Sequence, residues 1–207
     1  MKSDRKMVFA TSNPGKLREI SAMASEYGLT ITSPADLGLS VDVKEDGKTF
    51  KENASKKVRT FADAIKDPRV LIIGDDSGIE IPALDNQPGV FTRRWSGKEM
   101  TDQEIISYCL EKMKNLSGKD RRAVFRTVLA LGRYGEDMKF FEGSLQGEIL
   151  KKADKRPIVP GLPFGAIFHV SESDMLLLDM HGKSQKERKG YKTHREKAFH
   201  RLFQYLE

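Results

Sequence analysis

Two adjacent carboxylates follow an apolar run near the middle of the chain. Residues 70–73 (VLII) are all apolar and three are β-branched, which predicts a strand buried on both faces. Asp75 and Asp76 come just after it, and their negative charges repel each other. A bound Mg²⁺ or Mn²⁺ removes this conflict and makes a nearby carboxylate useful as a base toward water. Because ligands in α/β sheets bind at the carboxyl ends of strands, the pair predicts a metal site. An Asx-type turn is the structural alternative.

An anion-binding segment is predicted near the N-terminus, where "ATSNPGK" joins a strand to a helix. The start of a helix offers N–H groups and a partial positive charge, and Lys16 adds a full one. The segment lacks the glycine spacing and Lys-Ser/Thr pair of a P-loop, so an ordinary helix capped by Asn13 is the alternative. The candidate binding residues are Thr11, Ser12, Asn13, Gly15 and Lys16.

A second charged helix start is "EDGKTFKENASKK" at residues 45–57. Glu45 precedes a glycine turn, and Glu52, Asn53 and Lys57 lie on the helix that follows. Acidic residues favour helix N-termini in any case, so a solvated helix start is the alternative.

A concentrated positive segment, "KGYKTHREKAF" at residues 189–199, precedes and opens the last helix. Thr193 and Glu196 form a capping box that places His194 and Arg195 in the first turn. Cations there are unfavourable against the helix dipole unless an anion lies nearby, and arginine binds phosphate through two hydrogen bonds. A basic tail in contact with solvent is the structural alternative. With the acidic residues above, the pattern is typical of a metal-dependent enzyme that acts on a polyphosphate.

The elements that must position these residues alternate early and form hairpins later. The pattern predicts strands at 7–10, 31 and 70–73, and helices at 14–27, 50–65, 101–116 and from 193 onward. It also predicts a hairpin around Gly135 and two further short strands at 166–170 and 175–180. This order favours a mixed-sheet α/β fold with two lobes, and residues 154–165 form its longest irregular loop.

Composition limits the function classes. The 207 residues are 38% hydrophobic and 32% charged, which indicates a globular protein. The net charge of +6 is compatible with an anionic partner, and a solvated basic surface without a partner is the alternative. The single cysteine, Cys109, allows no disulfide within the chain and favours a reducing compartment. No run approaches about 20 apolar residues, so we expect no membrane span and a cytoplasmic location.

Five segments, in register from residue 10 to residue 199, resemble the inosine triphosphate pyrophosphatases, which hydrolyse non-canonical purine nucleoside triphosphates. "ATSNPGKLREI" resembles the opening Thr-x-Asn-x-x-Lys stretch of that family, and "EDGKTFKENASKK" resembles its Glu-x-Gly-x-Thr-Phe-x-Glu-Asn-Ala segment. "GDDSGIEIPALDNQPGVFTRRWSG", "FEGSLQGEI" and "THREKAF" resemble its Asp-Asp-Ser-Gly block and its two later elements.

The resemblance implies one domain over residues 1–207, with an elongated mixed sheet, two lobes around a central cleft, and a homodimer. It implies Mg²⁺-dependent cleavage (Mn²⁺ also serving) of ITP, XTP, dITP and dXTP to monophosphate and pyrophosphate. Glu45 and Asp76 match metal-binding carboxylates, and Asp76 also matches the general base. The positions that match substrate contacts are Thr11, Asn13, Lys16, Lys57, Ser77, Arg94, Lys189, His194 and Arg195.

The base-binding loop departs from that family's Gly-Phe-Gly-Tyr/Trp-Asp-Pro pattern. Leu162 replaces the stacking phenylalanine, Gly165 replaces the carboxylate, and Phe164 keeps an aromatic ring. Hydrogen bonds to a base edge supply most discrimination against polar analogues, so we expect reduced base selectivity.

Three alternatives stay open from sequence. A Maf-like or relaxed-specificity pyrophosphatase would keep the chemistry and change the substrate. A nucleic-acid-binding module would explain the basic charge, but basic–aromatic interleaving, zinc spacing and an obvious recognition helix are missing, so we expect no stable nucleic-acid partner. A non-catalytic nucleotide sensor would not need both metal carboxylates and the base.

Overall fold

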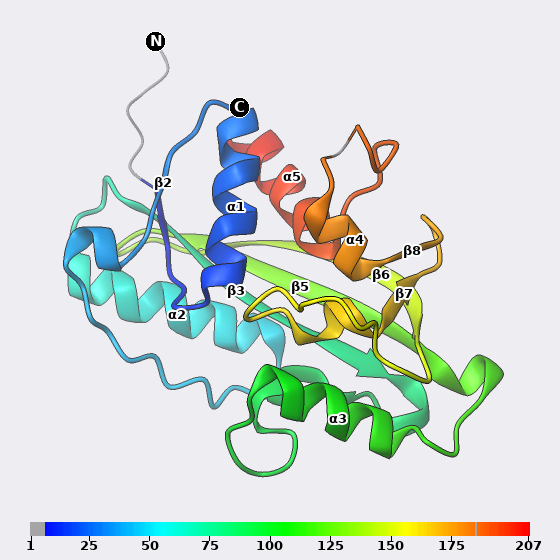
Figure 1. The fold of residues 1–207 in the computed structure, drawn as a ribbon. Coiled ribbons are helices and arrows are strands. Elements are labelled where there is room, and N and C mark those ends of the chain that lie inside the picture. Colours follow the sequence, from blue (N-terminus) through cyan, green and yellow to red (C-terminus); the bar gives the residue numbers. More distant parts are fainter. Residues whose placement is uncertain (1–6, 185) are drawn as a thin grey trace. The chain divides into compact units, whose positions relative to one another are not determined.

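The computed structural model describes residues 7–184 and 186–207 and shows a mixed α/β fold (Figure 1). The strands are β1 (Met7–Phe9), β2 (Ile31–Thr32), β3 (Leu71–Ile81), β4 (Gln87–Pro88), β5 (Arg122–Gly132), β6 (Lys139–Ile149), β7 (Phe168–Val170) and β8 (Met175–Leu176). They form a sheet in the order β2-β1-β3-β5-β6-β7-β8, with β4 paired to β3. β1 is parallel to β2 and β3, whereas β7 is antiparallel to β6 and β8. The predicted mixed α/β class is therefore confirmed.

The longer helices begin where the sequence supplies a side-chain cap. They are α1 (Pro14–Glu26), α2 (Phe50–Ile65), α3 (Asp102–Lys112), α4 (Leu177–Gly182) and α5 (His194–Leu206). The short 3₁₀ turns are η1 (Ala35–Leu37), η2 (Pro82–Leu84), η3 (Gly89–Arg94), η4 (Gly118–Arg121) and η5 (Pro163–Ala166). Asn13, Thr101 and Thr193 cap α1, α3 and α5 as predicted, the last two with reciprocal capping boxes. None of the described helices is long and apolar enough to cross a membrane.

The chain contains two compact units. The first unit comprises residues 7–76, 127–142 and 198–207, and the second comprises residues 77–126 and 143–197. In the first unit, successive residues of β1 alternate between two apolar clusters: Met7 and Phe9 pack with α1 and α5, while Val8 packs with α2. Residues 71–73 of β3 divide in the same way, so this part of the strand is buried on both faces, as the sequence predicted.

The core of the second unit joins α3 to β3, β6, β7 and α4. Ile105 and Cys109 of α3 are fully buried there, and so is the ring of Phe164 from η5. The guanidinium of Arg121 is buried beside this core and donates to the carbonyls of residues 113, 116, 149 and 150. A buried cation is tolerated when its donors are satisfied in this way.

Two expected elements differ in the structure. The strand predicted at 175–180 keeps only Met175–Leu176, and the chain then turns into α4. Leu177 and Met180, three residues apart, both face the core, and a short apolar run is compatible with either a strand or a helix. The helix predicted to reach residue 116 ends at Lys112.

Candidate active site

The two adjacent carboxylates lie where β1 stops. β1 pairs with β3 as far as Phe9 opposite Ile73, and the N–H of Ala10 donates to the carbonyl of Ile73 at 2.8 Å. The chain then leaves the sheet toward α1, whereas β3 runs on through Asp75 and Asp76 to Ile81. The expectation that the pair follows the end of its own strand was therefore wrong: it follows the end of the neighbouring strand.

Helix α2 lies close to β3 at this level because Gly74 has no side chain. A Cβ on Gly74 would lie 2.3 Å from the carbonyl oxygen of Ala54, so α2 could not pack so closely with any other residue there. One turn further along α2, Lys57 is positioned beside Asp75, and its Nζ donates to the backbone carbonyl of Asp75 at 2.9 Å.

Lys57 joins the predicted carboxylates. Its ammonium lies 2.7 Å from Oε2 of Glu45 and 3.7 Å from Oδ1 of Asp76. The Lys57 side chain is 9% exposed and that of Asp76 is 8% exposed, whereas Glu45 is 41% exposed. Glu45, Lys57 and Asp76, which are far apart in sequence, thus form one cluster that we call the acid–lysine cluster.

Asn53 fixes the orientation of Asp76. Its Nδ2 donates to Oδ2 of Asp76 at 3.1 Å, and its Oδ1 accepts from the N–H of Gly47 at 2.8 Å. Asn53 is 1% exposed, and a Cβ on Gly47 would lie 2.5 Å from its Oδ1. The sequence prediction placed Asn53 in the correct segment but omitted it from the site. Its position three residues after the Thr49–Phe50 helix start gave no signal that it reaches a distant strand.

In the segment before α1, backbone N–H groups are hydrogen-bonded to side chains of the same segment. Oδ1 of Asn13 accepts from the N–H groups of Gly15 and Lys16 at 2.9 and 3.1 Å, and Oγ1 of Thr11 accepts from the N–H of Asn13. These helix N–H groups are therefore capped, as the structural alternative held. The ammonium of Lys16 pairs with the carboxylate of Asp75, which is fully buried. Ser12 is exposed.

Burial and charge oppose each other in the acid–lysine cluster. Burial raises the pKa of Asp76, although the nearby charges of Lys57 and Lys16 act in the opposite direction. Burial alone would lower the pKa of Lys57, but the negative charges of Asp76 and Glu45 outweigh it and raise that pKa. Lys57 is therefore a fixed cation, and Asp76 is a more basic carboxylate than an exposed aspartate.

The oxygen donors in this cluster fit a hard divalent cation. Mg²⁺ is usually held by one or two protein carboxylates together with substrate phosphates and water, and Glu45 and Asp76 provide two carboxylates around one shared cation, the Lys57 ammonium. The described residues contain no group of three or more metal-ligating side chains of the His, Cys, Asp and Glu types. Asp75, the third predicted ligand, pairs with Lys16 in this structure, and its role as a ligand stays a prediction.

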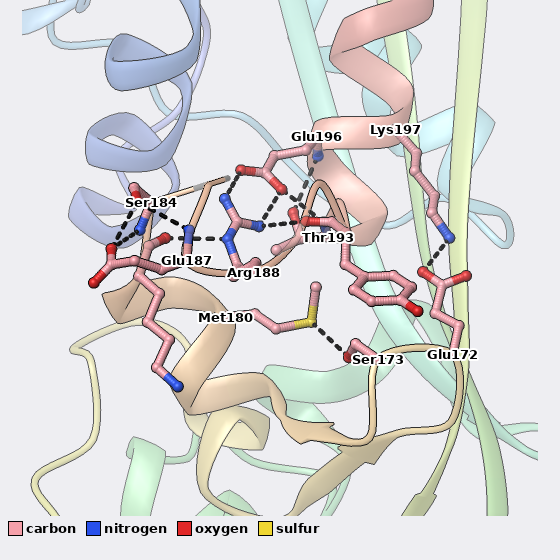
Figure 2. A network of polar contacts seen from close by, with 11 residues as sticks. Glu172, Ser173, Met180, Ser184, Glu187, Arg188, Thr193, Glu196 and Lys197 are labelled. Carbon is pink, nitrogen blue, oxygen red and sulfur yellow. Dashed lines mark hydrogen bonds and ion pairs between the residues drawn. The ribbon is translucent and has the colours of Figure 1, made fainter.

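The second unit brings Ser77 and Arg195 together. Nη2 of Arg195 donates to Oγ of Ser77 at 3.2 Å, across 118 positions of sequence. Arg195 and His194 are each 1% exposed, and the His194 ring lies on Phe125 with 4.1 Å between centroids. The loop that precedes these residues is fixed by the polar network of Figure 2, in which Arg188 pairs with Glu196.

The remaining predicted contacts lie on the second unit with different exposures. Lys189 and Arg94 are exposed, and Leu162 is half-buried. Phe164 is 1% exposed and its ring packs edge-on against Phe125, so the structure places it in the core and not at a surface. Gly165 is buried, and a Cβ there would be 3.6 Å from Cα of Leu178, an ordinary contact distance.

The fold and the site define an α/β protein in which two lysines and three carboxylates gather where the first parallel strand ends. The model of the Ham1 family matches residues 7–205, and the chain belongs to this family.

Proteins with solved structures and curated relatives agree with that assignment over nearly the whole chain. A "dITP/XTP pyrophosphatase" of Bacillus subtilis is 32% identical over 203 residues, covering 98% of both chains. One of Thermus thermophilus is 37% identical over 199 residues, covering 96% of this chain and 90% of that protein. The structure of the Staphylococcus aureus Ham1 protein superposes with a TM-score of 0.77 at 30% identity, covering 97% of each chain. The family expected from the five segments is therefore confirmed.

Proposed function

We propose that this protein is a nucleoside triphosphate pyrophosphatase that hydrolyses non-canonical purine nucleotides, dITP and XTP with their relatives ITP and dXTP, to the monophosphate and pyrophosphate. The observation that carries the proposal is the acid–lysine cluster, which combines a buried carboxylate with fixed cations. The curated relatives named dITP/XTP pyrophosphatase support the substrate class.

Each part of the first unit's site has a task in this reaction. Lys16 and Lys57 neutralise the triphosphate, whose charge must be balanced before water can approach. Asp76, oriented by Asn53, takes the proton of the attacking water at its Oδ1 while the bond between the α- and β-phosphates breaks and pyrophosphate leaves. A Mg²⁺ ion held by Glu45 and Asp76 would supply further charge neutralisation on the phosphate oxygens.

Residues of the second unit match nucleotide-binding positions of the resembled family. Arg195 is oriented by its hydrogen bond to Ser77, and Lys189, His194 and Arg94 complete the set that the resemblance implies. A cytoplasmic location and a homodimer are further proposals, supported by the lone buried Cys109 and by the family resemblance respectively.

A relaxed base preference is the second candidate function, and the loop at 161–166 favours it. Gly165 carries no carboxylate, and the Phe164 ring is packed in the core. The carboxylate that would contact the base edge in the resembled family is thus replaced by Gly165, and the aromatic ring of Phe164 belongs to the core. The lysines proposed to bind the triphosphate, Lys16 and Lys57, are present.

Pyrophosphate release from dITP, XTP, ATP and GTP, with and without Mg²⁺, tests the proposal. Asp76→Asn keeps the shape of the residue and removes the base, so we expect turnover to fall by about 10²–10⁴-fold. Asp63→Asn alters an exposed aspartate on α2 and serves as the matched control, with turnover unchanged. Near-normal turnover in Asp76→Asn would show that the base has been assigned wrongly.

A further inference from the structure

Arg188 lies at the centre of the network in Figure 2 and has no role in the function proposed above. Its Nη1 and Nη2 each donate to a different carboxylate oxygen of Glu196 at 2.6 Å, and its Nε donates to the carbonyl of Lys183 at 3.0 Å. Its Nη1 also donates to the carbonyl of Tyr191 at 3.1 Å. Arg188 is 4% exposed, and Glu196 is 6% exposed.

Glu196 has a second partner that links this pair to α5. Its Oε2 accepts from the N–H of Thr193 at 2.7 Å, while the N–H of Glu196 donates to Oγ1 of Thr193 at 3.1 Å. The Glu196 carboxylate therefore completes the capping box of α5 and also accepts hydrogen bonds from both terminal nitrogens of the Arg188 guanidinium. The Glu196 side chain thus connects the start of α5, with His194 and Arg195 in its first turn, to the preceding loop.

The backbone between Arg188 and Tyr191 turns through two residues with positive φ. Lys189 has φ +53° and Gly190 has φ +82°, so a lysine occupies the left-handed region that residues with a side chain rarely adopt. Such a conformation persists only where the surroundings hold it, and it tends to occur at binding sites. The side chain of Arg188 donates to the carbonyls of Lys183 and Tyr191, which lie on either side of Lys189 and Gly190.

We propose that Arg188 is a positioning residue for nucleotide binding: through Glu196 it fixes the loop at 186–191 on the start of α5 and so places Lys189 relative to His194 and Arg195. This inference rests on the function proposed above. A buried ion pair often contributes little to the free energy of folding, and its better-supported effect is to favour one conformation over others. This is the effect that we assign to the pair of Arg188 and Glu196.

The test separates positioning from stability with two buried arginines of the same unit. Arg188→Met removes the fork, whereas Arg121→Met removes an equally buried guanidinium that donates to backbone carbonyls elsewhere. Both variants should lower the melting temperature. We expect KM for dITP to rise at least tenfold in Arg188→Met with kcat within about threefold of the parent, and KM to stay within about twofold in Arg121→Met.

Two conservative variants refine the result and remain informative if Arg188→Met does not fold. Arg188→Lys keeps the charge without the fork and should give an intermediate KM, while Glu196→Gln keeps the acceptor for Thr193 and should raise KM by weakening the pairing with Arg188. Full activity of Arg188→Lys, or equal KM values in the Arg188→Met and Arg121→Met variants, would overturn the proposal.

Hydrogen exchange decides the positioning role even if no triphosphate is hydrolysed. Arg188→Met should speed amide exchange in the peptide covering residues 186–193 and leave the peptides of α2 unchanged. Unchanged exchange at 186–193 would overturn the inference, whereas an inactive parent enzyme with accelerated exchange in the variant would count against the proposed function alone.

Discussion

The carboxylate of Asp76 is held from two sides by α2. Asn53 donates to its Oδ2, and the Lys57 ammonium lies near its Oδ1. The two α2 residues are four positions apart, so they lie on one face of the helix and reach the same carboxylate. Asp76 is therefore oriented before any substrate arrives, which is the condition for efficient proton transfer.

Asn53 should matter through Asp76. Asn53→Ala removes the hydrogen bond to Asp76 and the acceptor for the Gly47 N–H, so we expect kcat to fall by about 10- to 100-fold. Asn53→Asp should be worse, because it brings a second negative charge to the same oxygen. Steady-state kinetics check this, with exposed Asn115→Ala as the control. Equal kcat for Asn53→Ala and the parent would remove Asn53 from the site.

Glu45 should act through the metal. Glu45→Gln removes the charge of a half-exposed carboxylate near Lys57, so we expect the Mg²⁺ concentration for half-maximal activity to rise. Glu52→Gln, on the exposed side of the same segment, is the comparison, since Glu52 bonds only locally to the N–H of Lys48. If Glu45→Gln and the parent need the same Mg²⁺ concentration for half-maximal activity, Glu45 is not a metal ligand.

The starts of α1, α3 and α5 were predictable from sequence because capping is local. Asn13 with Pro14 and Thr101 with Glu104 needed no knowledge of distant residues. The length of β3 was not predictable from its own residues. Beyond Ile73 it loses β1 as a partner, but β5 is its other neighbour in the sheet, and β4 pairs with its last two residues, Glu80 and Ile81. A strand that polar residues interrupt in sequence is thus continued by pairing with residues that come later.

The loop at 161–166 should weaken base selectivity. We expect the preference in kcat/KM for XTP or ITP over ATP and GTP to stay below several hundred-fold, because no carboxylate in this loop rejects the wrong base edge. Gly165→Asp should increase the preference, since a Cβ fits there at ordinary contact distance, while Gly165→Ala should not. A preference of several hundred-fold or more in the parent would mean that other groups read the base.

The kind of chemistry at the site could be predicted from sequence better than which of its residues contact one another. The residue types at 45, 57, 75 and 76 indicated metal and phosphate chemistry, and the structure gathers them in the first unit. The pairing of Lys16 with Asp75, 59 positions apart, depends on β1 and β3 being neighbours, which no local pattern gives. The pairing of Arg188 with Glu196 was missed because Arg188 lies just before the segment at 189–199 and Glu196 was assigned only to the capping box with Thr193.

Cys109 reports on the integrity of the second unit's core. Burial raises the pKa of its thiol to about 12, so the neutral thiol is favoured in the fold. This contribution to stability is present below the usual thiol pKa and is lost as the pH rises from there toward 12. We expect the native protein to resist a thiol-specific reagent at pH 8 and to react with one equivalent after unfolding in guanidinium. Rapid reaction of the native protein would contradict the described burial.

The identity of the products tests the proposed reaction most directly. Purified protein is incubated with dITP and Mg²⁺, and the products are separated by anion exchange and identified by mass. Cleavage between the α- and β-phosphates predicts dIMP and pyrophosphate in equal amounts, with Asp76→Asn slowing both alike. Formation of dIDP and inorganic phosphate, or no hydrolysis of dITP, XTP or any other purine triphosphate, would contradict the account.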